Sequence, residues 1–217
     1  MQRAAFYHYS LLPQTLNLIQ AEQVLEQHFP GCAIVGIDEA GRGPLAGPVV
    51  AAAAVLKSPP PFLNDSKKLS EKQREHIFCD LQTYCAHHSI NEASAAEIDK
   101  IGILNATFLA MRRALAPITS KLEKANQPYK ILVDGNLYIR EMDCALQMPI
   151  IKGDGRVACI AAASIFAKVH RDNQMKSFAQ KFPLYGFEKH KGYGTKTHIA
   201  AIKEFGQCEI HRRSFKI

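Results

Sequence analysis

The chain has 217 residues, of which 47% are hydrophobic, and this suits one globular domain with a sizeable core. Its formal net charge of +7 favours an anionic partner, such as nucleic acid, acidic lipid or a small phosphate. Residues 1–13 lack the pattern of a signal peptide, and the longest apolar run, 48–56, is too short to span a bilayer, so we expect a soluble, cytoplasmic protein.

The first half of the chain predicts a helix, two strands and a second helix. Apolar residues at helical spacing indicate the first helix, which Pro30 and Gly31 end, and Ser70 caps the second. The two apolar runs flank the glycine-rich turn 41–43 and indicate a strand–turn–strand unit, although the alanines of the second run also permit a helix. The expected bounds are 15–29 and 70–84 for the helices and 33–38 and 48–56 for the strands.

The second half predicts helices with two further strands between them. Pro117 lies inside one of these helices and is expected to kink or end it, and the basic tail 211–216 is expected to be mobile. The expected bounds are 95–101, 103–122, 157–176 and 195–205 for the helices and 129–134 and 149–152 for the strands. This order predicts an α/β fold with helices packed on one sheet, with residues 1–31 as an N-terminal helical extension and 32–217 as the main domain.

Acidic residues follow two of the predicted strands, at Asp38-Glu39 and at Asp134, and Asp154 lies in a Gly-Asp-Gly turn before the long helix. A single aspartate in such a place is commonly a turn or capping residue. Strand alternation should also point Asp38 and Glu39 to opposite faces, unless the strand ends or twists there. Several such acids together are nevertheless the oxygen ligands that magnesium prefers, and two ions roughly 4 Å apart can promote cleavage of a phosphodiester.

Other metal chemistry is not indicated. None of the six cysteines belongs to a CxxC pair, and the nine histidines are scattered, with His87-His88 expected at a junction between a helix and a strand. We therefore expect reduced thiols and no zinc site.

Six segments, in this order, closely resemble the type 2 ribonucleases H, the family of bacterial ribonuclease HII. They are GIDEAGRGPLAGPVVAAAAVL (36–56), NDSKKLS (64–70), LVDGN (132–136), KGDGRVACIAAASIFAKVHRD (152–172), HKGYGT (190–195) and HRRSF (211–215). The resemblance runs from about residue 33 to the end of the chain, and motifs of this length and order are far more specific than an isolated Asp-Glu pair.

The resemblance implies an RNase H-like fold, with a central mixed sheet flanked by helices and a helical C-terminal part. It implies a magnesium- or manganese-dependent endonuclease, with a two-metal mechanism, that cuts the RNA strand of RNA–DNA hybrids. It also implies incision 5′ of ribonucleotides embedded in duplex DNA, which leaves 3′-hydroxyl and 5′-phosphate ends. The main domain, 32–217, is then the catalytic domain.

The site residues that the resemblance implies fall into two groups. The catalytic and metal-binding acids would be Asp38, Glu39, Asp134 and Asp154. The substrate-binding residues would be the loop Gly41, Arg42 and Gly43, the ribose-sensing Tyr193, and Ser66 and Lys67, which we favour for phosphate contact. On the long helix, Ser164, Lys168 and Arg171 are alternatively expected to pack or to pair with acids.

Two alternatives from other classes remain open at this point. A non-catalytic nucleic-acid-binding protein of the same fold would need none of the four acids. A small-molecule phosphotransferase is less favoured because residues 41–48 lack the GxxxxGK[ST] pattern. No role is assigned to residues 1–31, no membrane contact is expected, and no protein partner, including a sliding clamp, can be read from the sequence.

Overall fold

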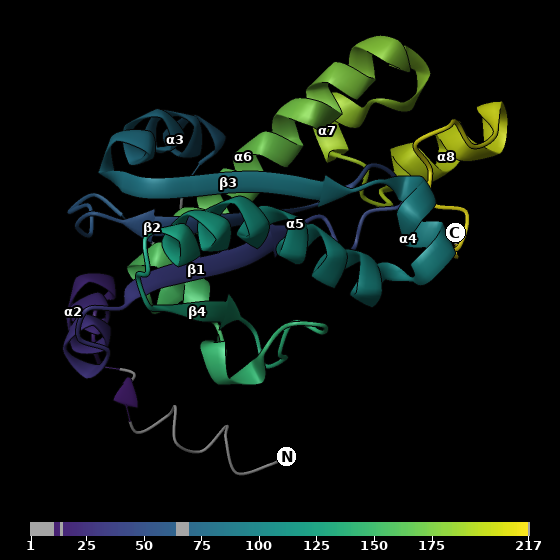
Figure 1. Cartoon of the computed structure of the whole chain (residues 1–217). Coiled ribbons are helices and arrows are strands. Elements are labelled where there is room, and N and C mark those ends of the chain that lie inside the picture. The colour runs from purple at the N-terminus through teal and green to yellow at the C-terminus, as the bar shows by residue number, and fades with distance from the viewer. Residues whose placement is uncertain (1–10, 14, 64–69, 217) are drawn as a thin grey trace.

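The computed structural model describes residues 11–13, 15–63 and 70–216 and is built around one five-stranded mixed sheet (Figure 1). The strand order is β3-β2-β1-β4-β5. The first three strands pair antiparallel to one another, whereas β1, β4 and β5 run parallel. The strands are β1 (Ala33–Ala40), β2 (Val49–Leu56), β3 (Cys85–Ala93), β4 (Tyr129–Asp134) and β5 (Gln147–Ile150).

Two long helices cover the two faces of this sheet, α5 on one side and α6 on the other (Figure 1). The smaller helices lie at the ends of the sheet and along α6. The helices are α2 (Leu18–His28), α3 (Glu71–Tyr84), α4 (Ala95–Ile101), α5 (Ile103–Lys124), α6 (Ala158–Lys181), α7 (Phe187–His190) and α8 (Lys196–Phe205). In the described part of the chain, no helix is long and apolar enough to cross a membrane.

Strand β2 explains why the alanine-rich run forms a strand rather than a helix. Its odd-numbered residues, such as Ala51 and Ala53, pack in the cluster under α5, and its even-numbered residues, such as Ala52 and Ala54, pack in the cluster under α6. A strand buried on both faces needs an unbroken apolar run, and pairing with β1 and β3 satisfies its backbone.

Helix α6 lies unusually close to β1. A Cβ atom on Gly36 would lie 2.3 Å from the backbone carbonyl carbon of Cys159, so only glycine permits this approach. The close contact brings the middle of α6, which carries Ser164 and Lys168, over the end of β1, which carries the first acidic pair.

Three expectations about the elements need correction. His87 and His88 lie inside strand β3 and not at a junction between a helix and a strand. No bounds were predicted for β3, because an edge strand with an exposed polar face shows no continuous apolar run. Helix α5 runs from Ile103 to Lys124, close to the expected 103–122, but Pro117 does not end it, since the residues after the proline still bury apolar side chains against the sheet. The fifth strand begins and ends two residues earlier than the expected 149–152.

The expected mobile tail is also wrong for the residues described. His211 and Arg212 are 2% and 1% exposed, and His211 forms a β-bridge with Ala46. Beyond them, Asp99 accepts hydrogen bonds from the backbone of Arg213 and Ser214. The tail is therefore held against the rest of the described chain through residues 211–214. All six cysteines are free, in line with the expected thiols.

Helix α2, from the N-terminal extension, shares a hydrophobic cluster with β4, β5 and the start of α6. Its Glu22 is 2% exposed and accepts a hydrogen bond of 3.2 Å from the backbone N–H of Cys159. The N-cap residue of α6, Val157, offers no side-chain cap, so Glu22 takes that place from another helix.

Glu22 should make the stability of the protein depend on pH. Burial raises the pKa of Glu22 from 4.5 to about 7, with hydrogen bonds from Cys159 acting in the opposite direction. The protonated carboxyl is thus favoured in the folded state, so its contribution to stability is complete below pH 4.5 and is lost as the pH rises through 7. The loss amounts to about 3 kcal/mol, or roughly 6–12 °C in melting temperature.

Glu22→Gln cannot ionise and should therefore melt close to wild type at about pH 5 and well above it at about pH 8.5. Thermal unfolding at the two pH values measures this. Glu204→Gln, at an exposed position of α8, is the matched control, and its melting temperature should differ from that of wild type by the same amount at both pH values. An equal offset between Glu22→Gln and wild type at both pH values would contradict the expectation.

Candidate active site

A cavity of about 390 Å³ opens at the ends of β1 and β4, and it contains all four of the predicted acids. The acids come from three places in the chain: the end of β1, the end of β4, and the short 3-10 turn 153–155 that follows β5. The cavity is lined by Asp38, Glu39, Ala40, Gly41, Arg74, Asp134, Asp154, Ser164, Lys168 and Tyr193. Residues that are far apart in the sequence therefore meet at one end of the sheet.

Asp38 and Glu39 both reach this cavity although both are strand residues of β1. Asp38 is 5% exposed and lies beneath α6, where the hydroxyl of Ser164 donates a hydrogen bond to its carboxylate. The backbone N–H of Glu39 donates another, at 2.7 Å, to Asp38 Oδ1. Strand alternation was expected to point these two side chains to opposite faces of the sheet. Both still reach the cavity, because it lies around the end of the strand and not on one face of the sheet.

Asp134 and Asp154 are linked through the turn 153–155. Asp134 Oδ1 accepts hydrogen bonds from the backbone N–H groups of Gly153, at 2.6 Å, and Asp154, at 3.3 Å. A Cβ atom on Gly153 would lie 2.6 Å from Ile160 Cδ1, so glycine lets the turn fit between β4 and α6. Asp134 thus fixes the turn that brings Asp154 to the cavity. Asp154 is 3% exposed there.

The electrostatics of the site favour a cation. Burial, and then the neighbouring carboxylates of Asp134 and Glu39, raise the pKa of Asp38 well above its usual value. Burial also raises the pKa of Glu39, against the lowering effect of the Arg42 guanidinium. Negative charges gathered in a buried place repel one another, and a bound divalent cation would remove that repulsion.

The donor set fits a hard divalent cation held partly by substrate. In the described ranges, no group of three or more acidic, histidine or cysteine side chains is already arranged to hold a metal ion. Magnesium commonly keeps several waters and is held by one or two carboxylates together with substrate phosphates. Oxygen donors that line a cavity without closing around its centre fit that mode of binding.

Basic side chains surround the acids on the cavity rim. Arg42 pairs with Glu39 at 3.3 Å, and Lys168 pairs with Asp172 at 2.8 Å. Lys168 lies one helical turn after Ser164, so that both reach the cavity from α6. Arg74, from α3, also lines the cavity, and sequence reasoning missed it because a helix-surface arginine carries no motif of its own.

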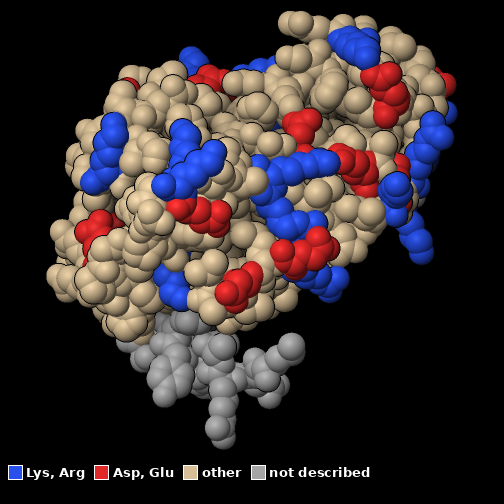
Figure 2. Space-filling model, viewed as in Figure 1, with Lys and Arg blue, Asp and Glu red and all other residues tan. Residues whose placement is uncertain are grey.

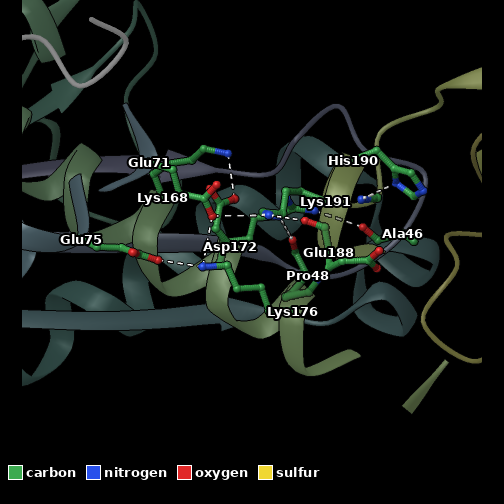
Figure 3. A network of polar contacts seen from close by, with 12 residues as sticks. Ala46, Pro48, Glu71, Glu75, Lys168, Asp172, Lys176, Glu188, His190 and Lys191 are labelled. Carbon is green, nitrogen blue, oxygen red and sulfur yellow. Dashed lines mark hydrogen bonds and ion pairs between the residues drawn. The ribbon is translucent and has the colours of Figure 1, made fainter. Parts of the chain in front are cut away.

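Ion pairs tie α3, and with it Arg74, to α6 and the segment after α7. Lys176 pairs with Glu71 at 3.1 Å and with Glu75 at 2.7 Å, and Lys191 pairs with Glu71 at 3.5 Å (Figure 3). These pairs are partly exposed and each contributes little to stability, but together they fix where α3 begins beside the cavity.

The predicted substrate loop lies beside the acids. Gly41 lines the cavity, and a Cβ atom on Gly43 would lie 3.6 Å from Cε1 of Tyr193, so the loop faces the tyrosine ring. Tyr193 is 46% exposed, and Arg42 projects with its side chain half exposed. Ser66 and Lys67, the residues favoured for phosphate contact, lie outside the described residues.

The basic surplus of the chain is not gathered on the face that carries α5. Figure 2 shows Lys and Arg side chains interspersed there with Asp and Glu. Two of the basic residues of α5 are paired, Arg112 with Glu141 and Arg113 with Glu97. The charge of this face is locally balanced, in contrast with the concentrated charges of the cavity.

Comparison with known proteins points to one family. A sequence model of the family described as ribonuclease HII matches residues 35–217. The chain is similar to the ribonuclease HII of Fusobacterium nucleatum subsp. nucleatum, with 54% identity over 186 residues, which cover 84% of this chain and 85% of the relative.

Two solved structures are similar over most of this chain. Ribonuclease H2 from Pyrococcus horikoshii OT3 has a TM-score of 0.64 and 26% identity, and the match covers 84% of this chain and 93% of that one. Ribonuclease HII from Archaeoglobus fulgidus, solved in complex with PCNA, has a TM-score of 0.69 and 24% identity, with coverage of 85% and 96%. These likenesses confirm the expected α/β, RNase H-like fold.

Proposed function

The chain belongs to the ribonuclease HII family and is an endoribonuclease that acts on RNA–DNA hybrids, and we propose that the four acids of the cavity carry out its reaction. The observation that supports this assignment is their convergence: Asp38, Glu39, Asp134 and Asp154 reach one cavity from three separate segments. A non-catalytic binder would gain nothing from burying mutually repelling carboxylates, which cost stability unless a cation or a proton offsets their charge.

The enzyme is metal-dependent, as its family is, and we propose magnesium or manganese as the metal. The four carboxylates would hold the ions, which when bound supply activation of a water and stabilisation of the leaving oxygen, to give 3′-hydroxyl and 5′-phosphate ends. Ser164 contributes by holding the carboxylate of Asp38 with its hydroxyl hydrogen, and the turn amides contribute by fixing Asp134. Arg42 and Lys168 are placed on the rim to meet phosphates of the substrate.

We further propose that the enzyme incises duplex DNA 5′ of a single embedded ribonucleotide. The loop 41–43 and Tyr193 would read the 2′-hydroxyl, which is the group that distinguishes RNA from DNA. Gly43 has no side chain to keep a sugar away from its backbone, and the Tyr193 ring stands opposite it.

A labelled duplex with one ribonucleotide tests the proposal, with an all-DNA duplex of the same sequence as control and a long RNA–DNA hybrid as a second substrate. We expect cleavage of the first and third substrates with magnesium or manganese, and none of the all-DNA duplex. Addition of EDTA should stop cleavage without releasing the hybrid. Cleavage that persists in EDTA would exclude the metal role, and cleavage of long RNA tracts alone would exclude reading of a single ribonucleotide.

A further inference from the structure

Two arginines are buried under the substrate loop: Arg171 of α6 and Arg212 of the C-terminal segment are each 1% exposed. Buried guanidinium groups are normally paired with acids. The hydrogen bonds of these two go instead to backbone carbonyl oxygens of residues 41–48 (Figure 3 shows Ala46 and Pro48 on this network). Arg171 was expected to pack or to pair with an acid, and its partners are carbonyls.

The contacts of the arginine pair cover almost the whole loop. Arg171 donates from Nε to the carbonyl of Pro48 and from Nη2 to that of Ala46, both at 3.1 Å. Arg212 donates to five carbonyls, those of Gly41 (2.5 Å), Arg42 (3.0 Å), Pro44 (2.7 Å), Gly47 (2.9 Å) and Pro48 (3.1 Å). Six of the eight residues of this irregular segment therefore turn a carbonyl inward to a guanidinium.

The loop also rests directly on the arginines. Gly41 has φ +97°, and a Cβ atom there would lie 2.1 Å from Nε of Arg171 and 2.8 Å from the carbonyl oxygen of Pro48. The path of the backbone at the first residue of the substrate loop is thus set by the guanidinium beneath it. A different group in that place would leave several buried carbonyls without donors, which costs about 1–3 kcal/mol for each.

The same arrangement joins the loop to Tyr193. The N–H of Leu45 donates to the carbonyl of Gly192 at 2.8 Å, and the N–H of Arg212 donates to the carbonyl of Leu45 at 2.9 Å. A Cβ atom on Gly192 would lie 2.5 Å from the carbonyl oxygen of Ala46, so these backbones are in close contact. The loop, the tyrosine segment and the C-terminal segment are therefore locked to one another around the arginine pair.

We propose that Arg212 and Arg171 are positioning residues for recognition of the 2′-hydroxyl, because they fix the carbonyl-inward conformation of loop 41–48 and its distance from Tyr193. The inference rests on the proposed role of loop 41–43 and Tyr193. Neither arginine needs to touch the substrate. Lysine cannot replace either one, since its ammonium lacks the planar fork that donates to several carbonyls at once.

The test compares Arg212→Lys and Arg171→Lys with wild type on two substrates, the single-ribonucleotide duplex and a long RNA–DNA hybrid. The readout is the ratio of kcat/KM for the two, because a loss of folded enzyme lowers both values and leaves the ratio unchanged. We expect the ratio to fall roughly tenfold in Arg212→Lys, since a small misplacement of recognition groups has a large effect on rate. Arg171→Lys, which loses two carbonyl partners instead of five, should fall less.

Arg213→Lys is the matched control, since it makes the same change at the next residue, which is exposed, and should keep the wild-type ratio. If Arg212→Lys yields no folded protein by circular dichroism, Arg171→Lys decides the matter. A wild-type ratio in folded Arg171→Lys and Arg212→Lys would overturn the inference. Failure of wild type to cut the single-ribonucleotide duplex would instead overturn the proposed function, so the two failures are distinguishable.

Discussion

Asp134→Asn is expected to lower cleavage of an RNA–DNA hybrid roughly a thousandfold, the scale of losing one group that stabilises charge in a transition state. Asparagine keeps an oxygen that can accept the N–H groups of Gly153 and Asp154, so the turn that carries Asp154 should stay in place. What is lost is the negative charge in the cavity. Hybrid binding, which depends mainly on phosphate contacts, should remain close to wild type.

The measurement is single-turnover cleavage together with hybrid binding by fluorescence anisotropy. Asp143→Asn is the matched control: Asp143 also accepts a backbone N–H, that of Ala145 at 2.8 Å, but lies in the exposed segment before β5. It should cleave at the wild-type rate. Full activity of Asp134→Asn with magnesium would remove Asp134 from the catalytic set, and equal losses of binding and cleavage would indicate a structural role.

The sequence predicts the strands that are buried on both faces well and the polar edge strand β3 poorly. The segments that form β1, β2 and β4 are unbroken apolar runs because both of their faces are covered. Strand β3 alternates between exposed and covered positions and carries histidines, so its pattern resembles that of a polar segment after a helix. Local propensity at Pro117 was likewise overridden by the packing of α5 on the sheet.

The four acids could be predicted as residues but not as a site. Each strand-end acid has an ordinary explanation by itself, and only the strand order, with β4 beside β1, shows that Asp38 and Asp134 lie next to each other. Their assignment as catalytic therefore came from the resemblance to a family, and it remains a proposal to be tested by substitution.

The buried arginines could not be predicted by local reasoning at all. Arg212 reads as part of a basic, exposed tail, and its partners are carbonyl oxygens more than 160 residues earlier in the chain. A carbonyl carries no sequence signal, so a side chain that binds only carbonyls has no recognisable partner in the sequence. Burying two like charges together has a cost that is visible in Arg212. Burial, and then the neighbouring Arg171, lower the pKa of Arg212 to about 9.

Tyr193→Ala is expected to lower incision at a single ribonucleotide roughly a hundredfold, because it removes a stacking surface and a hydrogen bond together. The ring stands beside Gly43 on the cavity wall, 46% exposed and therefore open to a sugar. Tyr193→Phe keeps the ring and removes only the hydroxyl, so its loss should be closer to tenfold. A long hybrid presents many 2′-hydroxyls and no required junction with DNA, so its cleavage should fall less in both variants.

The measurement is the kcat/KM of each variant on the single-ribonucleotide duplex and on the long hybrid. Tyr84→Phe, at a tyrosine whose ring packs edge-on against Phe62 at 5.3 Å, is the control for removal of a hydroxyl and should match wild type on both substrates. Equal losses on the two substrates would mean that Tyr193 supports cleavage in general and does not read the junction. If Tyr193→Phe is fully active and Tyr193→Ala is not, the ring would act by stacking alone, and contact with the 2′-hydroxyl would fall to the backbone of loop 41–43.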